Sequence, residues 1–241
     1  MFEMFANSLV SGFFKSNVTG QIIVFAQLLG SVIMVAVMLG KWKALSGTVH
    51  VMRRVSRDVM TGRDVLDYYL QRHESSHTAI ENIYTATCER LLKLLTPDAR
   101  ALIAGRAGEG KPVALTNHEV ELVKSICDHV LDEEIMRVEH GMGAIATVVA
   151  LSPMLGLLGS VWGVLDAFAE MGAAGNATIS TLAPSISAAL VTTVVGLIIA
   201  IPGVLVYNFQ MASIRSIVSD MEGFADDLKG RIALEFQGRD A

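Results

Sequence analysis

Residues 141–165 read GMGAIATVVALSPMLGLLGSVWGVL, a stretch without a single charged side chain. The hydrocarbon core of a bilayer is about 30 Å thick, and roughly 20 apolar residues in a helix cross it. The stretch is long enough for such a crossing. It therefore decides the fold class, because it indicates a membrane helix.

Two further uncharged runs, residues 16–40 and 171–214, flank it along the chain. The later run is roughly twice the length that one span needs, so it should hold one span with a turn and an extension. The 241 residues are 52% apolar and 6% aromatic, and the mean hydropathy of +0.49 is high for a hydrated globular domain. We expect an all-α integral membrane protein with three transmembrane helices extended into a cytoplasmic helical bundle.

The distribution of Lys and Arg predicts how the chain is oriented, because basic residues near span ends stay cytoplasmic. Only Lys15 precedes the first span, whereas five basic residues follow it closely, namely Lys41, Lys43, Arg53, Arg54 and Arg57. The N-terminus is therefore expected in the periplasm and the C-terminus in the cytoplasm of a bacterium, in the inner membrane. The expected segments are a periplasmic segment at 1–17, spans at 18–40, 141–168 and 182–208, a cytoplasmic helical hairpin at 41–140, a periplasmic loop at 169–181 and a cytoplasmic amphipathic helix at 209–241.

Heptad spacing of apolar residues between Val55 and Leu94 predicts one long cytoplasmic helix. Thr116 and Glu119 have the spacing of a capping box, so a second helix should begin there and continue without a breaker into the second span. A third stripe follows the last span, at Ile214, Ile217, Met221, Phe224, Leu228 and Ile232, and predicts a helix packed on the same bundle. Cys88 and Cys127 are expected to be ordinary buried thiols, since no CxxC is present.

Residues 73–77, HESSH, have the H-E-x-x-H spelling of zinc metalloproteases. No recognised motif supplies a third ligand downstream, and His73 and His77 lie on the heptad seam, with Glu74 between them. We interpret them as packing histidines whose influence on the cytoplasmic helices is open, and a membrane zinc protease is the minor alternative. Residues 105–112 resemble a nucleotide loop, but Pro112 stands where a Mg²⁺-binding hydroxyl is needed. No metal, cofactor, enzymatic activity or nucleic-acid partner is expected.

Small residues recur on one face of each later span, which allows helices to approach closely. They are Ser152, Gly156, Gly159 and Gly163 in one, and Ala189, Thr193, Gly196, Ala200 and Gly203 in the other. The hydroxyls of Ser160 and Thr193, with Thr192 alongside, could line a polar path. Asp166, at the outer end of the second span, fits either an outer-mouth role or a solvated helix end. No Asp or Glu lies near the middle of a span, so a titrating carboxylate would have to come from a partner.

At these positions the chain resembles a known family. Residues 151–163 (LSPMLGLLGSVWG) and 182–208 (LAPSISAALVTTVVGLIIAIPGVLVYN) resemble the TolQ/ExbB branch of the MotA/TolQ/ExbB proton channel family. The resemblance is close over residues 140–210, and the order of three spans around a large cytoplasmic insertion agrees with it. The flagellar MotA branch, which has four spans, is a poorer match.

The resemblance implies a homopentamer in the membrane lipid, around one or two transmembrane helices of a single-span ExbD/TolR-like partner whose aspartate is protonated and released as protons run down the proton-motive force. Such an assembly is a motor that does work across the periplasm, with the proton, or another ion, as the coupling ion. Family threonines that face this aspartate correspond to Ser160 and Thr193, and the family prolines that bend or begin spans correspond to Pro153, Pro184 and Pro202.

One position departs from the family pattern. Ala188 stands where P-G-I-A-E-A-L in the family has its glutamate. The chain could therefore serve a divergent partner, use a different ion, or be a scaffold that does not conduct.

Overall fold

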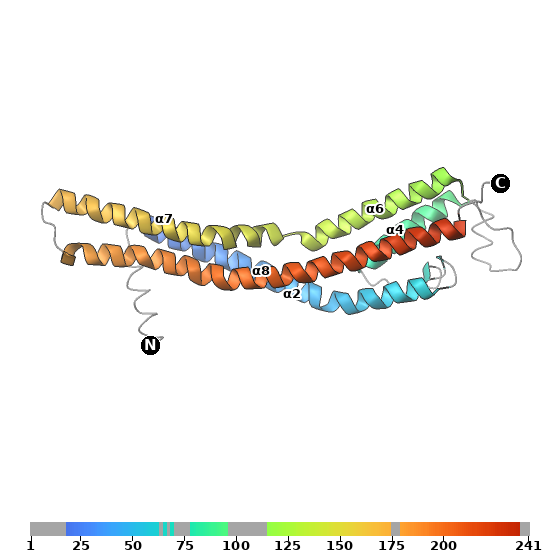
Figure 1. Ribbon diagram of the computed structural model, residues 1–241, viewed down its shortest axis with the longest axis horizontal. Helices are drawn as coiled ribbons and strands as arrows, with labels where there is room; N and C mark the ends of the chain where they lie inside the picture. The colour runs from blue at the N-terminus through green and yellow to red at the C-terminus, as the bar shows by residue number, and fades with distance from the viewer. Residues whose placement is uncertain are drawn as a thin grey trace, which may run out of the picture. The chain divides into compact units, whose positions relative to one another are not determined.

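The computed structural model describes residues 18–62, 65–66, 68–69, 78–95, 115–174 and 179–236. These ranges contain five helices and no strand (Figure 1). The helices are α2 (Val18–Thr61), α4 (Ala79–Leu94), α6 (Asn117–Glu139), α7 (Met142–Ala174) and α8 (Ile179–Phe236). The all-α class is confirmed.

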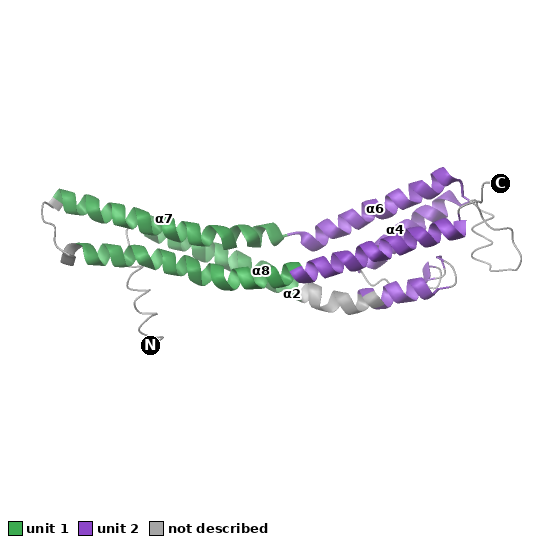
Figure 2. Ribbon diagram, in the orientation of Figure 1, with its two compact units in different colours: residues 1–42, 141–211 green, residues 43–140, 212–241 purple. Residues whose placement is uncertain are grey.

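The chain forms two compact units, coloured separately in Figure 2. Unit 1 comprises residues 1–42 and 141–211, and unit 2 comprises residues 43–140 and 212–241. Helices α2 and α8 contribute residues to both units, since each continues past the boundary without a break.

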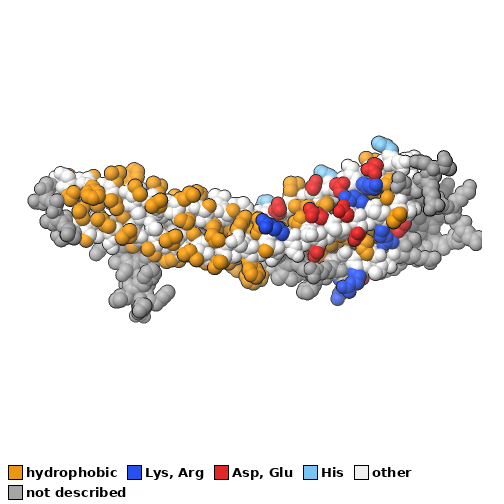
Figure 3. Space-filling view, viewed as in Figure 1, with side chains coloured by type: hydrophobic (Ala, Val, Ile, Leu, Met, Phe, Trp, Pro, Cys, Tyr) orange, Lys and Arg blue, Asp and Glu red, His pale blue; other side chains and the backbone are white. Residues whose placement is uncertain are grey.

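Unit 1 is the membrane part of the molecule. Three helical segments are long and apolar enough to cross a membrane: Val18–Trp42, the apolar part of Asn117–Ala173, and the apolar part of Leu182–Phe236. Among the described residues, every large apolar side chain that is exposed belongs to unit 1, except Met136 and Leu234. Figure 3 shows this apolar surface over α7 and the first part of α8. Side chains of this kind are stable against lipid or other apolar helices, so the three expected membrane helices are confirmed.

Unit 2 has an apolar core built from α4, α6 and the ends of α2 and α8. The stripe predicted after the last span is buried: Ile214, Ile217, Met221, Phe224, Leu228 and Ile232 are each at most 2% exposed, and all of them except Ile214 belong to this core. It extends α8 directly, so one helix carries both the last span and the tail. The outer surface of α6 and of this part of α8 carries charged side chains (Figure 3).

The prediction of one long helix over residues 55–94 is wrong, because α2 ends at Thr61 and α4 begins at Ala79. The guanidinium of Arg231 on α8 donates hydrogen bonds to the carbonyl oxygens of Val59, Met60 and Gly62, at 2.9, 3.1 and 3.0 Å. Cationic donors at a helix C-terminus satisfy its last carbonyls. A residue distant in sequence thus holds the end of α2.

The expected continuity between α6 and the second span is also wrong. Helix α6 ends at Glu139 and α7 begins at Met142, with Gly141 between them at φ +86°. Only glycine adopts this left-handed backbone readily, which makes it a frequent helix terminator. The start of α6 was predicted correctly: the Thr116 hydroxyl accepts from the Glu119 N–H, and the Glu119 carboxylate accepts from the Thr116 N–H.

Candidate functional site

Helices α7 and α8 touch backbone to backbone in unit 1. A methyl group added to Gly156 would lie 2.8 Å from the Cα of Thr193 and 2.9 Å from the carbonyl oxygen of Thr192. One added to Gly159 would lie 2.5 Å from Thr192 Oγ1, and one added to Gly163 would lie 2.6 Å from Ala189 Cβ. The small residues predicted to pack these two helices therefore meet the facing helix directly, as in close membrane helix pairs.

This close approach brings two hydroxyl groups together. Ser160 Oγ on α7 lies 2.7 Å from Thr193 Oγ1 on α8. Ser160 Oγ also donates to the Ala189 carbonyl oxygen at 2.8 Å, and Thr193 Oγ1 donates to the Gly156 carbonyl oxygen at 2.9 Å. Each hydroxyl thus bonds a backbone carbonyl of the other helix. We call Ser160 and Thr193 the hydroxyl pair.

The hydroxyl pair can bond a further polar group. A hydroxyl carries one proton to donate and two lone pairs to accept with. The two protons can serve two of the three contacts at a time, and in every arrangement the two oxygens retain acceptor capacity. Both residues are only half-buried. A protonated carboxyl group could donate to either oxygen. A carboxylate would instead require one hydroxyl to turn its proton away from the backbone.

Thr192 has a different place from its neighbour. Its hydroxyl lies 2.9 Å from the Gly156 carbonyl oxygen and 2.7 Å from the Ala189 carbonyl oxygen, and the residue is 1% exposed. In the single chain it is enclosed in the helix contact, while Thr193 reaches the surface. Its position therefore suits packing better than contact with a partner.

Two buried glutamines tie α2 to the other membrane helices, and the sequence analysis did not single them out. Gln27 Nε2 donates to the Ser152 carbonyl oxygen on α7 at 2.9 Å, and Gln210 Nε2 on α8 donates to the Met38 carbonyl oxygen at 2.8 Å. The signal for Gln27 was present, since it is an amide within an uncharged run of residues, where a polar side chain needs a partner.

The three family-like prolines all lie inside helices, Pro153 in α7 and Pro184 and Pro202 in α8. A proline lacks the N–H that would bond the carbonyl four residues earlier, which weakens the helix at that point. In the same turn as Pro153, the Ser152 hydroxyl donates to the Val148 carbonyl oxygen at 2.7 Å.

Asp166 and Ala188 stand apart from the hydroxyl pair. Asp166 is half-buried on α7, and its six-residue separation from Ser160 corresponds to about 9 Å along the helix axis. Ala188 is 3% exposed and precedes Ala189, whose carbonyl accepts from Ser160. A longer side chain at position 188 would have to displace neighbouring atoms.

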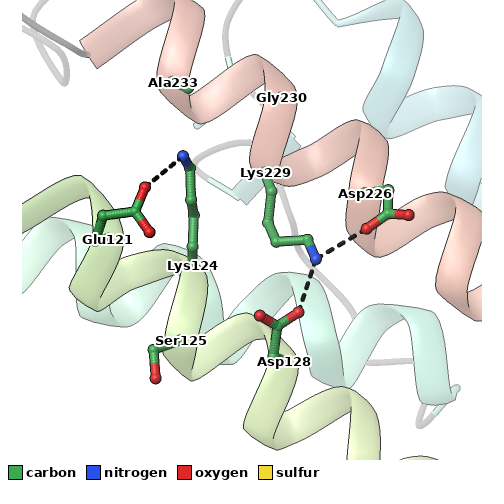
Figure 4. Close-up of a pocket in the computed structure, with 8 residues that line it drawn as sticks. All are labelled: Glu121, Lys124, Ser125, Asp128, Asp226, Lys229, Gly230 and Ala233. Carbon is green, nitrogen blue, oxygen red and sulfur yellow. Dashed lines mark hydrogen bonds and ion pairs between the residues drawn. The ribbon is translucent and has the colours of Figure 1, made fainter. Parts of the chain in front are cut away.

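Unit 2 has a groove of about 540 Å³ between α6 and α8, shown in Figure 4. Its charges are compensated within the groove: Lys229 Nζ lies 2.7 Å from Asp128 and 2.8 Å from Asp226, and Lys124 Nζ lies 2.7 Å from Glu121. Hydrogen bonds to Asp128 and then Asp226 raise the pKa of Lys229. The charged side chains that line the groove are therefore best explained by ion pairs within and between two packed helices.

The remaining candidates are two buried cysteines and two sequence motifs that lie outside the described residues. Cys88 and Cys127 are 0% exposed, and burial raises the pKa of the Cys88 thiol to about 12, so both are inert thiols at neutral pH. Within the described ranges, no group of three or more His, Cys, Asp or Glu side chains could hold a metal ion. His73, Glu74, His77 and the 105–112 loop lie outside those ranges.

Known protein families and sequences that are similar to this chain support the family resemblance. A family model described as the MotA/TolQ/ExbB proton channel family matches residues 94–223. The Tol-Pal system protein TolQ of Haemophilus influenzae is 28% identical over 220 residues, which is 89% of either chain.

Two other relatives match over less of their length. ExbB biopolymer transport proteins of Xanthomonas campestris and Neisseria gonorrhoeae are 37% and 40% identical, over 45% and 40% of this chain and 43% and 44% of theirs. Among solved structures, the flagellar MotAB stator complex from Bacillus subtilis is similar at 19% identity over 92% of this chain and 90% of that one. Its TM-score of 0.35 is too low to define a common helix arrangement.

Proposed function

Because this chain belongs to the MotA/TolQ/ExbB proton channel family, we propose that it is the oligomeric subunit of an inner-membrane motor driven by the proton-motive force. Five copies would surround the span of an ExbD/TolR-like partner and energise it for work or transport across the periplasm. The N-terminus would be periplasmic, the C-terminus cytoplasmic and the proton the coupling ion. The names of the relatives, TolQ and ExbB, support a role of this kind.

One observation carries this proposal, which is the hydroxyl pair on a half-buried surface of the α7 and α8 contact. Asp166, at the outer end of the second span, is the one carboxylate within the expected spans 18–40, 141–168 and 182–208, and none lies near the middle of a span. A titrating carboxylate at the level of the hydroxyl pair would therefore come from an aspartate of the partner. In its protonated form it would donate a hydrogen bond to Ser160 or Thr193, and in its charged form it would accept a hydrogen bond from one of these hydroxyls, which then releases its backbone carbonyl.

The two hydrogen-bond arrangements give the hydroxyl pair a mechanistic role. The pair would offer a partner in either protonation state of the aspartate, so neither state would leave a buried polar group unpaired in the membrane. Alternation between the states would then accompany proton release. Asp166 is proposed to act at the outer mouth, beyond the pair, and Thr192 to hold the helices that frame it.

Proton flux in liposomes tests this proposal. The chain would be purified with an ExbD/TolR-like protein and reconstituted with a pH-sensitive dye inside the vesicles. Thr193→Val, which removes the hydroxyl at nearly constant shape, should lower flux by about tenfold or more, as expected for loss of a hydrogen bond to a charged group, which contributes about 1.5–3 kcal/mol. Thr147→Val is the matched control, since Thr147 is an exposed residue on α7 whose hydroxyl donates within its own helix, to Gly143 O. Equal flux from the native and Thr193→Val complexes would refute the assigned role, and absence of a complex would refute the partnership.

A scaffold that does not conduct is the second candidate, and Ala188 favours it. This buried alanine occupies the position at which the resemblance implies a glutamate. A stable complex that carries neither proton nor sodium flux would support the scaffold. A zinc protease would require His73, Glu74 and His77, and stoichiometric zinc in the purified chain would be its signature.

A further inference from the structure

We propose that Gln27 is a positioning residue for the hydroxyl pair, through the hydrogen bond from its amide to the Ser152 carbonyl oxygen. The proposal rests on the proposed function, because it assigns the pair's geometry to a residue of the first membrane helix. Gln27 comes from α2, whereas Ser160 and Thr193 belong to α7 and α8. Gln27 is thus not a member of the hydroxyl pair.

Gln27 lies at the point where three helices meet. Its Nε2 is 2.9 Å from Ser152 O, and a methyl group added to Gly196 on α8 would clash with both Ser152 O and Gln27 Nε2, the latter at 2.9 Å. A side chain at position 196 would therefore collide with the amide and, more closely, with the Ser152 carbonyl oxygen. Any lateral shift of α7 against α8 at this level would change the amide's surroundings.

The level of Gln27 is adjacent to the hydroxyl pair. Ser152 is one helical turn from Gly156, whose carbonyl accepts from Thr193, and Gly196 is three residues from Thr193. One turn corresponds to about 5 Å along a helix. The amide therefore restrains α7 and α8 within a turn of the carbonyl that orients the Thr193 hydroxyl.

The chemistry of the amide argues that this hydrogen bond is its purpose. Gln27 is 2% exposed, and its Oε1 is buried without a hydrogen-bond partner in the described part of the chain. Only the NH₂ end can face a carbonyl oxygen, so the orphaned end must be Oε1. An unpaired acceptor in a membrane interior is costly, and leucine would fill the space without that cost. The amide is explained if its donor is needed at Ser152.

Gln210 is the matched control within the same molecule. It is 5% exposed, it also donates to a backbone carbonyl of another membrane helix, here from α8 to α2, and its Oε1 is also unpaired among the described atoms. It differs in place, because it lies about 25 Å along α8 from Thr193 at 1.5 Å per residue. A general contribution of buried amides to stability would appear equally at both positions.

The test compares Gln27→Leu with Gln210→Leu in the complex with the ExbD/TolR-like partner. Gln27→Leu should lower proton flux by roughly tenfold, since small misplacements at a reacting site have effects of up to about a hundredfold. Its thermal stability should fall little, because the orphaned acceptor leaves with the donor. Gln210→Leu should retain flux within about twofold of the native complex. Native flux in Gln27→Leu, or equal losses in both variants, would overturn the proposal.

Gln27→Glu adds a readout that packing alone cannot produce. The protonated carboxyl group can donate to Ser152 O as the amide does, whereas the carboxylate has no proton to donate. The ratio of variant to native flux should therefore be near one at low pH and fall as the new carboxyl group loses its proton. Taking the ratio removes the contribution of the partner's aspartate. A ratio independent of pH would count against the hydrogen bond to Ser152.

A disulfide measurement on the chain alone separates this proposal from the proposed function. Cysteines introduced by Ser160→Cys and Thr193→Cys should cross-link efficiently, because the native oxygens are 2.7 Å apart. Adding Gln27→Leu should lower the cross-linking rate severalfold, and adding Gln210→Leu should not. If the native complex carries no flux, the motor assignment fails, and the cross-linking rates alone then confirm or overturn the positioning by Gln27.

Discussion

Glycines of this chain occupy two opposite environments within helices. A methyl group on Gly196 would meet the Ser152 carbonyl oxygen and the Gln27 amide, while one on Gly223 in the same helix would meet nothing within 4 Å. The helix backbone prefers alanine to glycine by about 0.5–1 kcal/mol. Replacing glycine with alanine should therefore lower the stability of the fold at position 196 and raise it at position 223.

We expect Gly196→Ala to destabilise unit 1 by about 1–3 kcal/mol, because a backbone carbonyl cannot move aside cheaply. Gly223→Ala should stabilise unit 2 by about 0.5–1 kcal/mol. Unfolding of the purified protein in detergent, followed by circular dichroism, measures both. A stabilising Gly196→Ala would contradict the helix contact, and a destabilising Gly223→Ala would indicate that another chain covers that position.

At the scale of the helices, the ends are set partly by side chains from far along the chain. Arg231 bonds three carbonyls at the end of α2, and it also pairs with Glu235 at 3.0 Å. Glu235 in turn accepts from the Val65 N–H at 2.9 Å, and the Tyr84 hydroxyl donates to the Val65 carbonyl oxygen at 2.6 Å. Helices α8 and α4 thereby hold the chain as it leaves α2.

Replacing Arg231 with Met should free the end of α2. Three partly buried carbonyls would lose their donor, so we expect a loss of about 2–3 kcal/mol in unit 2. Hydrogen exchange in the last turn of α2 should become at least about tenfold faster, which 1.4 kcal/mol would produce. Arg215→Met is the control, because Arg215 is an exposed residue of the same helix and should change stability by less than about 0.5 kcal/mol. Unchanged exchange at Thr61 and Gly62 in Arg231→Met would contradict this account.

Local sequence predicted those elements whose cause is local. The uncharged runs predicted three membrane helices, the Thr116 and Glu119 spacing predicted the start of α6, and the stripe from Ile214 to Ile232 predicted the buried face of α8. The end of α2 at Thr61 was missed because Arg231, distant in sequence, determines it. Gly141 offered a local signal, but the continuing apolar spacing on both sides concealed it.

The candidate site was predictable to a similar extent. The small residues and the two hydroxyls were found from their spacing and from the family resemblance, and the structure brings Ser160 and Thr193 into contact. Gln27 was missed because its partner is a backbone carbonyl, which no sequence pattern shows. The roles in ion transfer remain predictions for Ser160, Thr193, Thr192 and Asp166.

At the scale of the whole molecule, the two compact units expose surfaces that suit different surroundings. Unit 1 exposes apolar side chains on each of its helices, among them Phe25 and Leu29 on α2, Leu157 on α7 and Leu205 on α8. The exposed surface of unit 2 carries ion pairs such as the one between Lys229 and Asp128. The first surface requires lipid or further apolar helices, and the second suits water.

A charge on the outer face of α2 should therefore oppose membrane insertion. Leu29 is 58% exposed and lies mid-way along the first span. Leu29→Asp should cost about 2.5–3.5 kcal/mol of insertion free energy, whereas Leu29→Phe should cost little. The carbonate-resistant fraction of the full chain in membranes measures the difference. Equal fractions for the two variants would show that this face does not meet an apolar environment.

The contact between Gly163 and Ala189 also limits how this sequence can change over time. An added methyl group at position 163 would lie 2.6 Å from the methyl group of Ala189, so the two positions share space for one side chain. Gly163→Ala alone is expected to be rejected, but together with Ala189→Gly it returns the same volume to the contact. Helices α7 and α8 would then accumulate changes in matched pairs, and their histories in descendants of this chain would be linked.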